Sequence, residues 1–95
     1  MSAYIILNVE VTDPARYGDY IKAAGESVAR YGGRYLVRGG RAERLEGVVE
    51  PKRLVVLEFE SFDRARAWWA SPEYAGPKAI RQSAARTEML LVEGV

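Results

Sequence analysis

The sequence predicts an α+β fold in which a four-stranded antiparallel sheet carries its helices on one face. Two observations support this. The expected elements follow the order strand, helix, strand, strand, helix, strand, which is the βαββαβ order of a ferredoxin-like sandwich. The first and third expected strands, residues 3–11 and 54–60, are also the most apolar, as strands at the centre of such a sheet should be. The 95 residues make one domain, residues 1–95.

The first half of the chain gives clear boundaries. Residues 3–11 alternate, so that one face is wholly apolar and the other mixed. Thr12-Asp13-Pro14 is a helix start, with an oxygen to cap free amides and proline at the first helical position. Gly32-Gly33 ends that helix. Its expected buried stripe follows helical spacing and consists of Tyr17, Ile21, Ala24, Val28 and Tyr31.

The second half begins with a strand at residues 34–38 that Gly39-Gly40 breaks. Turn signals fill residues 41–52, where Ala42 to Leu45 could continue as a ragged hairpin arm. Ser61 caps a helix that we expect to end near Ala70, because Ser71-Pro72 opens a new turn. The remaining expected elements are a capped turn at 71–74, an interruption at Gly76-Pro77, a short helix at 78–86 and a final strand at 87–95.

One face of the predicted sheet has no helix to cover it. The helices can cover the face of Ile5, Leu7 and Val55, but Tyr4, Ile6, Leu54 and Val56 lie on the opposite face. A contiguous apolar patch of this kind usually marks an interface. We therefore expect a homodimer that packs through the open sheet face, although a monomer with a few exposed apolar groups is the simpler alternative.

Composition excludes several chemistries. The chain has no cysteine and no histidine, so a thiolate nucleophile, a histidine base, a Cys/His metal site and a histidine-ligated haem are absent. We expect no cofactor.

No segment reads as a signal peptide or a membrane span, and we expect no membrane contact and a cytoplasmic location. The net charge of +1 gives no general field for nucleic acid. Five arginines between residues 30 and 44 are interleaved with glutamates, and we expect no nucleic-acid partner.

The chain resembles a known family over nearly its whole length. The residues that carry the resemblance are GRYLVRGG at 33–40, LEG at 45–47, Arg53, Glu58-Phe59, Ser61-Phe62, Ala65, Trp68-Trp69, SPEY at 71–74, Arg81 and VEG at 92–94. They are similar to the family catalogued as domain of unknown function 1330. The resemblance implies a dimeric α+β barrel, an architecture shared with cofactor-free antibiotic-biosynthesis monooxygenases and muconolactone isomerases. It implies nothing specific about activity.

The predicted site lies on the mixed face of the sheet. Glu58 and Asn8 lie on the two central strands, and Arg34 and Arg38 share their face if Tyr35 packs toward the helices. A carboxylate and a guanidinium on apolar walls could act as a base and an electrostatic stabiliser, which makes Glu58 and Arg38 the candidate catalytic pair. A structural ion pair across the dimer interface is the alternative, and we expect it more strongly. A hydrogen bond at the end of a strand is the alternative for Asn8.

Further candidate ligand-binding residues are Tyr4 on the open face and the aromatic and basic groups of the second half. Trp68 and Trp69 cannot both face the core, because successive helical residues point about 100° apart. One of them should pack on the sheet, and we assign Trp69 to a pocket with Tyr74. Arg81 and Tyr74 could donate to an acidic ligand, or Glu73 and Arg81 could form a surface pair.

Two functions remain compatible with the sequence. The first is a small protein that binds, or transforms without a cofactor, a small organic ligand in a cavity between the sheet and the helices. The second is a non-catalytic dimerisation or accessory module, in which the partner subunit simply fills the open face. A cavity of about 300 Å³ or more lined by Asn8, Arg38 and Glu58 would favour the first.

Overall fold

The computed structural model describes residues 1–95, and its elements follow the predicted order, with the capped turn and the short helix expected at 71–86 joined into one helix. The elements are β1 (Ala3–Val11), α1 (Pro14–Arg30), β2 (Arg34–Arg38), β3 (Arg53–Phe59), α2 (Phe62–Trp69), α3 (Pro72–Ala84) and β4 (Ala85–Glu93).

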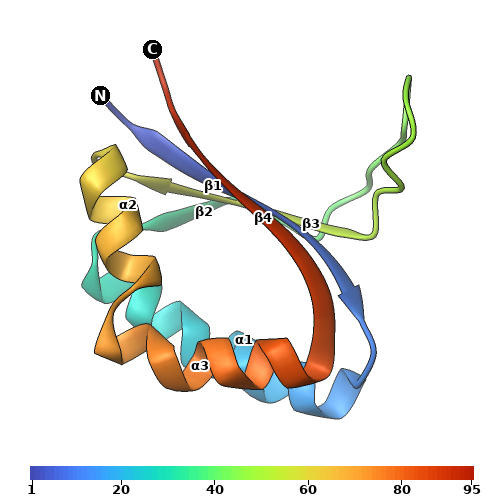
Figure 1. Ribbon diagram of the computed structural model, residues 1–95, viewed down its shortest axis with the longest axis horizontal. Coiled ribbons are helices and arrows are strands. Elements are labelled where there is room, and N and C mark those ends of the chain that lie inside the picture. The colour runs from blue at the N-terminus through green and yellow to red at the C-terminus, as the bar shows by residue number, and fades with distance from the viewer.

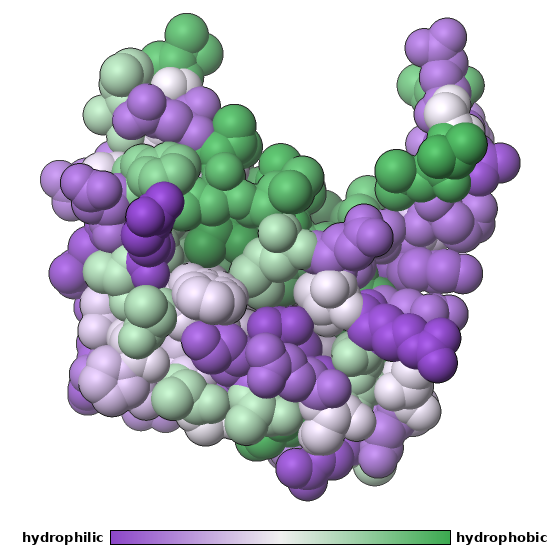
Figure 2. All heavy atoms as spheres, in the orientation of Figure 1, coloured by the Kyte–Doolittle hydropathy of each residue, from purple (hydrophilic) through white to green (hydrophobic).

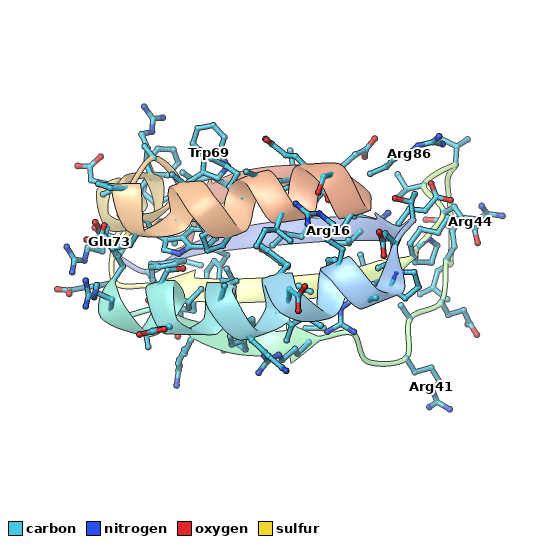
Figure 3. All side chains as sticks on the ribbon, turned by 90° about the horizontal axis from the view of Figure 1, so that it is seen from below. Arg16, Arg41, Arg44, Trp69, Glu73 and Arg86 are labelled. Carbon is cyan, nitrogen blue, oxygen red and sulfur yellow. The ribbon has the colours of Figure 1, made fainter.

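The four strands form one antiparallel sheet in the order β2-β3-β1-β4. The apolar strands β1 and β3 are central, which confirms the prediction of a ferredoxin-like α+β fold. The helices cover one face of this sheet, and α1 and α3 lie side by side across it (Figures 1 and 3). The other face of the sheet is uncovered. We call these the inner face and the open face.

The core lies between the inner face and the helices. Ile5, Leu7, Val9, Leu57 and Phe59 on the strands are all buried. Trp68 from α2 is completely buried, and its ring lies 5.5 Å from that of Phe59 and 4.0 Å from that of Tyr74, measured between centroids. Aromatic rings at such distances add to the stability that burial alone provides. The core therefore ties α2 and α3 to the sheet through one aromatic stack.

Helix α1 begins as predicted. The side chain of Asp13 accepts a hydrogen bond from the Arg16 amide, and Pro14 occupies the first turn. Its buried stripe differs from the predicted one, because Tyr20 and Ser27 are buried whereas Ile21 and Tyr31 are only partly so. The helix is therefore rotated toward α3, against which it packs closely.

Helix α3 corrects the prediction of an interruption at Gly76-Pro77. It runs without a break from Pro72 to Ala84, with Pro77 inside it. Proline removes one helical hydrogen bond, but burial of Tyr74, Arg81 and Ala84 holds the helix together. Strand β4 follows directly at Ala85, two residues earlier than expected.

Residues 41–52 form no strand, so the hairpin extension predicted at Ala42 to Leu45 is wrong. We call these residues the arm. The arm stands away from the body of the protein on the side of the open face, at the opposite end of the sheet from α2 and the two termini (Figure 1). Between the arm and the termini the surface is hollowed and largely apolar (Figure 2). None of the helices is both long enough and apolar enough to cross a lipid bilayer.

Candidate functional site

A layer of tyrosine and arginine side chains lies between the helices and the inner face of the sheet. We call it the Tyr/Arg cluster. It draws on four elements and on both halves of the chain, and it places hydroxyl and guanidinium groups where a small domain normally has only apolar side chains. Its members are Tyr17 and Tyr20 from α1, Tyr35 and Arg38 from β2, Arg53 from β3, and Tyr74 and Arg81 from α3.

The deepest part of the cluster is a chain of three polar side chains. The phenolic oxygens of Tyr20 and Tyr74 are 2.8 Å apart, and Nε of Arg81 donates to the Tyr74 oxygen over 3.2 Å. Tyr74 and Arg81 are seven residues apart on α3, so they lie on the same face of that helix. Only 6% of the Arg81 surface is exposed. Burial, with a contribution from Tyr74, raises the pKa of Tyr20 well above its usual range.

Arg53 and Tyr17 form the second part of the cluster. The guanidinium carbon of Arg53 lies 5.8 Å from the centre of the Tyr17 ring, and its Nε is buried without a hydrogen-bond partner. Burial raises the pKa of Tyr17, and the positive charge of Arg53 opposes that rise in part. Gly39 has a φ of 73°, and a side chain there would collide with the Arg53 guanidinium. The glycine that ends β2 thus makes room for the arginine of β3.

Arg38 belongs to the cluster because β2 contains a bulge. Tyr35 pairs with Leu57 and Val37 pairs with Val56, which leaves Leu36 as an extra residue and places Arg38 opposite Val55 on the inner face. The Arg38 guanidinium lies over the Tyr35 ring, 4.2 Å from its centroid. Burial raises the pKa of Tyr35, and Arg38 lowers it in part.

This bulge overturns the predicted partnership of Arg38 and Glu58. Simple alternation would place both side chains on the open face, but the extra residue turns Arg38 to the inner face. Glu58 pairs instead with Arg34 on the open face, where Nε of Arg34 lies 2.6 Å from Oε1 of Glu58. The pair lies within one subunit and uses Arg34, so it differs from the expected alternative of an ion pair across the dimer interface, and the predicted base and stabiliser cannot touch one ligand there.

The other residues predicted on the open face have identifiable contacts. Asn8 holds the base of the arm, because its Nδ2 donates to the Glu50 carbonyl over 2.9 Å and its Oδ1 accepts from the Lys52 amide over 2.8 Å. Tyr4 pairs with Glu58 and Val92 across the sheet. Neither residue touches the Tyr/Arg cluster, since both lie on the opposite face of the sheet.

The two tryptophans divide as predicted, with Trp68 in the core and Trp69 at the surface, but Tyr74 stacks on Trp68 and not on Trp69. The Nζ of Lys78 lies over the Trp69 ring, 3.8 Å from its centre. It also lines an apolar pocket of about 460 Å³ between α2 and β4, together with Ile5, Arg66, Ala70 and residues 89–91. We call this the corner pocket. Glu73 pairs with Arg30 and Tyr31, so the predicted surface pair with Arg81 is not formed.

The charge balance of the Tyr/Arg cluster is its most informative property. The three ion pairs of the structure involve Arg30, Arg34 and Arg44, so Arg38, Arg53 and Arg81 have no carboxylate partner. Of the three, Arg81 is buried, Arg53 is partly buried and Arg38 is exposed, so the cost of burying a guanidinium without an opposing charge falls mainly on Arg81 and Arg53. The raised pKa values of Tyr17, Tyr20 and Tyr35 keep these phenols neutral, so they act as hydrogen-bond donors and do not supply the missing negative charge.

Space in the cluster is limited in this conformation. The cavity between α1 and the sheet has a volume of about 20 Å³ and is lined mainly by Tyr17, Tyr20, Tyr35, Arg38, Arg53 and Trp68 with neighbouring apolar residues. This volume holds about one water molecule. Arg38 at its rim is exposed, so the cavity opens toward solvent between α1 and β2. A larger ligand would enter by displacing exposed side chains at this rim. No cluster of three or more acidic side chains forms a metal site.

Sequence reasoning missed four of the seven members of the cluster. Tyr17 was expected to be ordinary core, and Tyr20, Tyr35 and Arg53 were not singled out as site residues. The available signal was the combination of residue types: the four tyrosines of the cluster lie between the helices and the sheet, and the acidic residues of the chain all lie elsewhere. Arg38, Tyr74 and Arg81, which were predicted, are brought together with them.

Comparison with solved structures supports the fold. A protein of unknown function from Rhodopseudomonas palustris superposes with a TM-score of 0.80 at 16% identity, over 99% of this chain and 82% of that one. SnoaB, a cofactor-independent oxygenase from Streptomyces nogalater, gives 0.68 at 15% identity over 99% and 93%. A dimeric ferredoxin-like protein of unknown function from Thermobifida fusca gives 0.67 at 16% identity over 99% and 92%.

At these identities the likeness establishes the fold alone. No curated protein matches the sequence. A family model does match, over residues 2–95, and it carries the description domain of unknown function (DUF1330). The resemblance found in the sequence is therefore confirmed, and the chain belongs to the DUF1330 family.

Proposed function

We propose that the protein is a homodimer that binds a small organic anion between its sheet and its helices, without a cofactor. The single observation that carries the proposal is the burial of Arg81 with a tyrosine hydroxyl as its one hydrogen-bond partner and no carboxylate. Arg53, whose Nε is buried without a hydrogen-bond partner, adds a second guanidinium without a carboxylate to the same layer and lines its cavity. A carboxylate or enolate ligand would supply the negative charge that this layer lacks.

The chemistry of the cluster suits such a ligand. Guanidinium groups bind carboxylates through paired hydrogen bonds, and neutral phenols add further donors. The rings of Tyr17, Tyr20 and Trp68 give the cavity apolar walls against which a planar or aromatic body can pack. Arg38 keeps its predicted role as an electrostatic stabiliser, whereas Glu58 belongs to the open face. A group able to act as base at neutral pH is missing from the cluster, which favours binding over proton abstraction.

The dimer part of the proposal rests on the open face. Val37, Val56, Ile6 and Leu90 pair across the sheet as one apolar row over all four strands. Ile6, Val37 and Leu90 are exposed. Sheet-to-sheet packing would bury this row, with a total area of about 1,200 to 2,000 Å². Proteins of the same fold from Thermobifida fusca and a Jannaschia species are described as dimeric, which supports the same assembly here.

Thermal shift with a matched pair of probes tests the ligand. Benzoate and benzamide have the same shape, but only benzoate is an anion. We expect benzoate-type carboxylates to raise Tm, by an amount that corresponds to about 2.7 kcal/mol at 100 times Kd, and the amides to have little effect. Arg38→Gln should weaken the response, whereas Arg86→Gln makes the same charge change at an exposed residue of β4 and should not.

Two results would contradict the proposal. Equal stabilisation by the amide and the carboxylate would mean that the ligand needs no negative charge, which contradicts the proposed anion. No response to any carboxylate in a broad panel, with light scattering still showing a dimer, would favour the non-catalytic dimerisation module. A species of 10.6 kDa in light scattering at micromolar concentration would contradict the dimer itself.

A further inference from the structure

The arm carries exposed apolar side chains beside its charged ones. Its tip carries Leu45, which is 84% exposed, and Val48, which is 93% exposed, and Val49 beside them is also exposed. The base of the arm is fixed by the Asn8 hydrogen bonds, and an Arg44–Glu50 ion pair at 3.1 Å joins its two limbs. The arm is thus held in an outward position while its apolar side chains have nothing to cover them. Such exposure usually marks a contact with another molecule.

The open face differs between its two ends. At the end next to the arm lies a polar hollow of about 210 Å³, lined by Asn8, Glu10, Lys52 and residues 86–88 with no hydrophobic member. At the far end Tyr4, Leu90 and Val92 lie on the β1 and β4 side, with Leu90 67% exposed. This apolar area continues around β4 into the corner pocket, which α2 closes on its other side. The molecule therefore carries an apolar tip at one end and an apolar corner at the other.

Twofold symmetry limits how these two features can meet. Two sheets that pack through their open faces are related by a twofold axis lying between them. If that axis runs along the strands, the arm end of one subunit faces the arm end of its partner, and each tip lies over polar side chains or over the other tip. If the axis crosses the strands, each arm reaches the far end of the partner's sheet. Only this second arrangement covers both the tip and the corner.

The arm has sufficient length for this contact. It leaves β2 and returns to β3 at the same end of the sheet, so about six of its residues span the distance from base to tip, which is about 20 Å at 3.3 Å per residue. Sheets packed face to face are about 10 Å apart. A limb of this length, when extended, is long enough to carry the tip past the plane of the partner's sheet.

We propose that in the dimer the arm of each subunit docks its Leu45, Val48 and Val49 side chains on the apolar corner of its partner, between α2 and the β4 edge. The occupant of the corner pocket is a second copy of this chain, and the pocket is incomplete without it. The inference rests on the proposed homodimer but not on the proposed ligand. It assigns a purpose to two apolar features that the Tyr/Arg cluster leaves unexplained.

Disulfide trapping tests this contact, because the natural chain contains no cysteine. Val48→Cys lies on the arm, and Val92→Cys lies on the open face beside Leu90, which lines the corner pocket. Both positions are exposed and lie at opposite ends of one subunit, so folding should be unaffected. The double variant, oxidised under mild conditions, should run as a covalent dimer on a non-reducing gel and return to monomer with reductant. Each single variant should remain monomeric on the same gel.

Each other outcome overturns the inference. Cross-linking of Val48→Cys alone would show that the arms meet each other, and cross-linking of Val92→Cys alone would show that the far ends meet. No cross-link in the double variant, with light scattering still reporting a dimer, would show that the arm does not reach the corner. A monomeric natural chain would overturn the homodimer and the arm contact together, and light scattering separates that result from the others.

Discussion

The hydroxyls of Tyr20 and Tyr74 meet at 2.8 Å in the interior and join α1 to α3 by one hydrogen bond. Tyr74 also accepts from Arg81, so this single oxygen serves a neighbouring phenol and a buried guanidinium together. Nearer the surface the same helices are also joined by the Arg16–Ser83 hydrogen bond of 2.7 Å and by the contact of Arg30 with Glu73. The tyrosine pair is therefore both a helix contact and the support of the Arg81 side chain.

Removing the Tyr74 hydroxyl should cost more than removing the Tyr20 hydroxyl. Tyr74→Phe leaves Arg81 without its hydrogen bond, and we expect the free energy of unfolding to fall by about 1 to 3 kcal/mol. Tyr20→Phe leaves the Arg81 contact in place, and we expect about 0.5 to 1.5 kcal/mol. Urea denaturation of both variants measures the difference. Equal losses would mean that Arg81 gains nothing from Tyr74.

Stability should fall at alkaline pH. The pKa values of Tyr17, Tyr20 and Tyr35 are raised above 10.0 in the folded protein, with burial as the main cause. Above pH 10 the unfolded chain loses these protons while the folded protein keeps them, so the free energy of unfolding decreases as pH rises. Below that range the three groups are protonated in both states and contribute no pH dependence.

Urea denaturation at a series of pH values tests this assignment. Tyr20→Phe should show a shallower alkaline decrease than the natural protein, because one of the shifted groups is gone. Tyr4→Phe changes a tyrosine outside the cluster and serves as the control. An alkaline slope that is unchanged in Tyr20→Phe would contradict the raised pKa of that residue.

Glu58→Gln separates the open face from the Tyr/Arg cluster. The substitution breaks the ion pair with Arg34, whose side chain is largely exposed, so we expect a loss of only about 0 to 1 kcal/mol of stability. Carboxylate affinity should be unchanged, because Glu58 lies on the face opposite to the cluster. A loss of carboxylate affinity comparable to that of Arg38→Gln, at unchanged dimer content, would show that Glu58 contributes to the ligand site.

The adjacent glycines after β2 form a matched pair. Gly39 has φ of 73° and the Arg53 guanidinium where a side chain would stand, whereas nothing lies within 4 Å of the position that a Gly40 side chain would take. We expect Gly39→Ala to lower stability by about 1 to 2 kcal/mol and to displace Arg53. Gly40→Ala should have a much smaller effect. Thermal unfolding and carboxylate titration of the two variants give the comparison.

The fold could be predicted because each strand and helix of this chain carries its own local signal. The apolar alternation of β1, the Asp13-Pro14 start of α1 and the Ser61 cap of α2 are all read within a few residues, and all are confirmed. The errors occur where tertiary packing opposes a local rule. Pro77 remains inside α3 because burial of Tyr74 and Arg81 on either side of it outweighs one lost hydrogen bond.

The site could be predicted only in part, because it depends on register. Arg38, Tyr74 and Arg81 were identified by residue type, but the face on which Arg38 lies depends on the extra residue in β2. Alternation in five residues is too weak to reveal such a bulge. Tyr20 was missed for a related reason, since its burial follows from how α1 is rotated against α3 and not from the spacing within α1.

The bulge in β2 decides which side chains of that strand reach the cavity. Deleting Leu36 would remove the extra residue, so that the strand would alternate strictly with Val37 still opposite Val56 and Arg38 still opposite Val55 on the inner face. Pairing of the full strand without the bulge would instead turn Arg38 to the open face, and the cluster would lose one of its three arginines without a carboxylate partner. The register of this short edge strand thus controls the charge at the mouth of the cavity without any change in the order of the sheet.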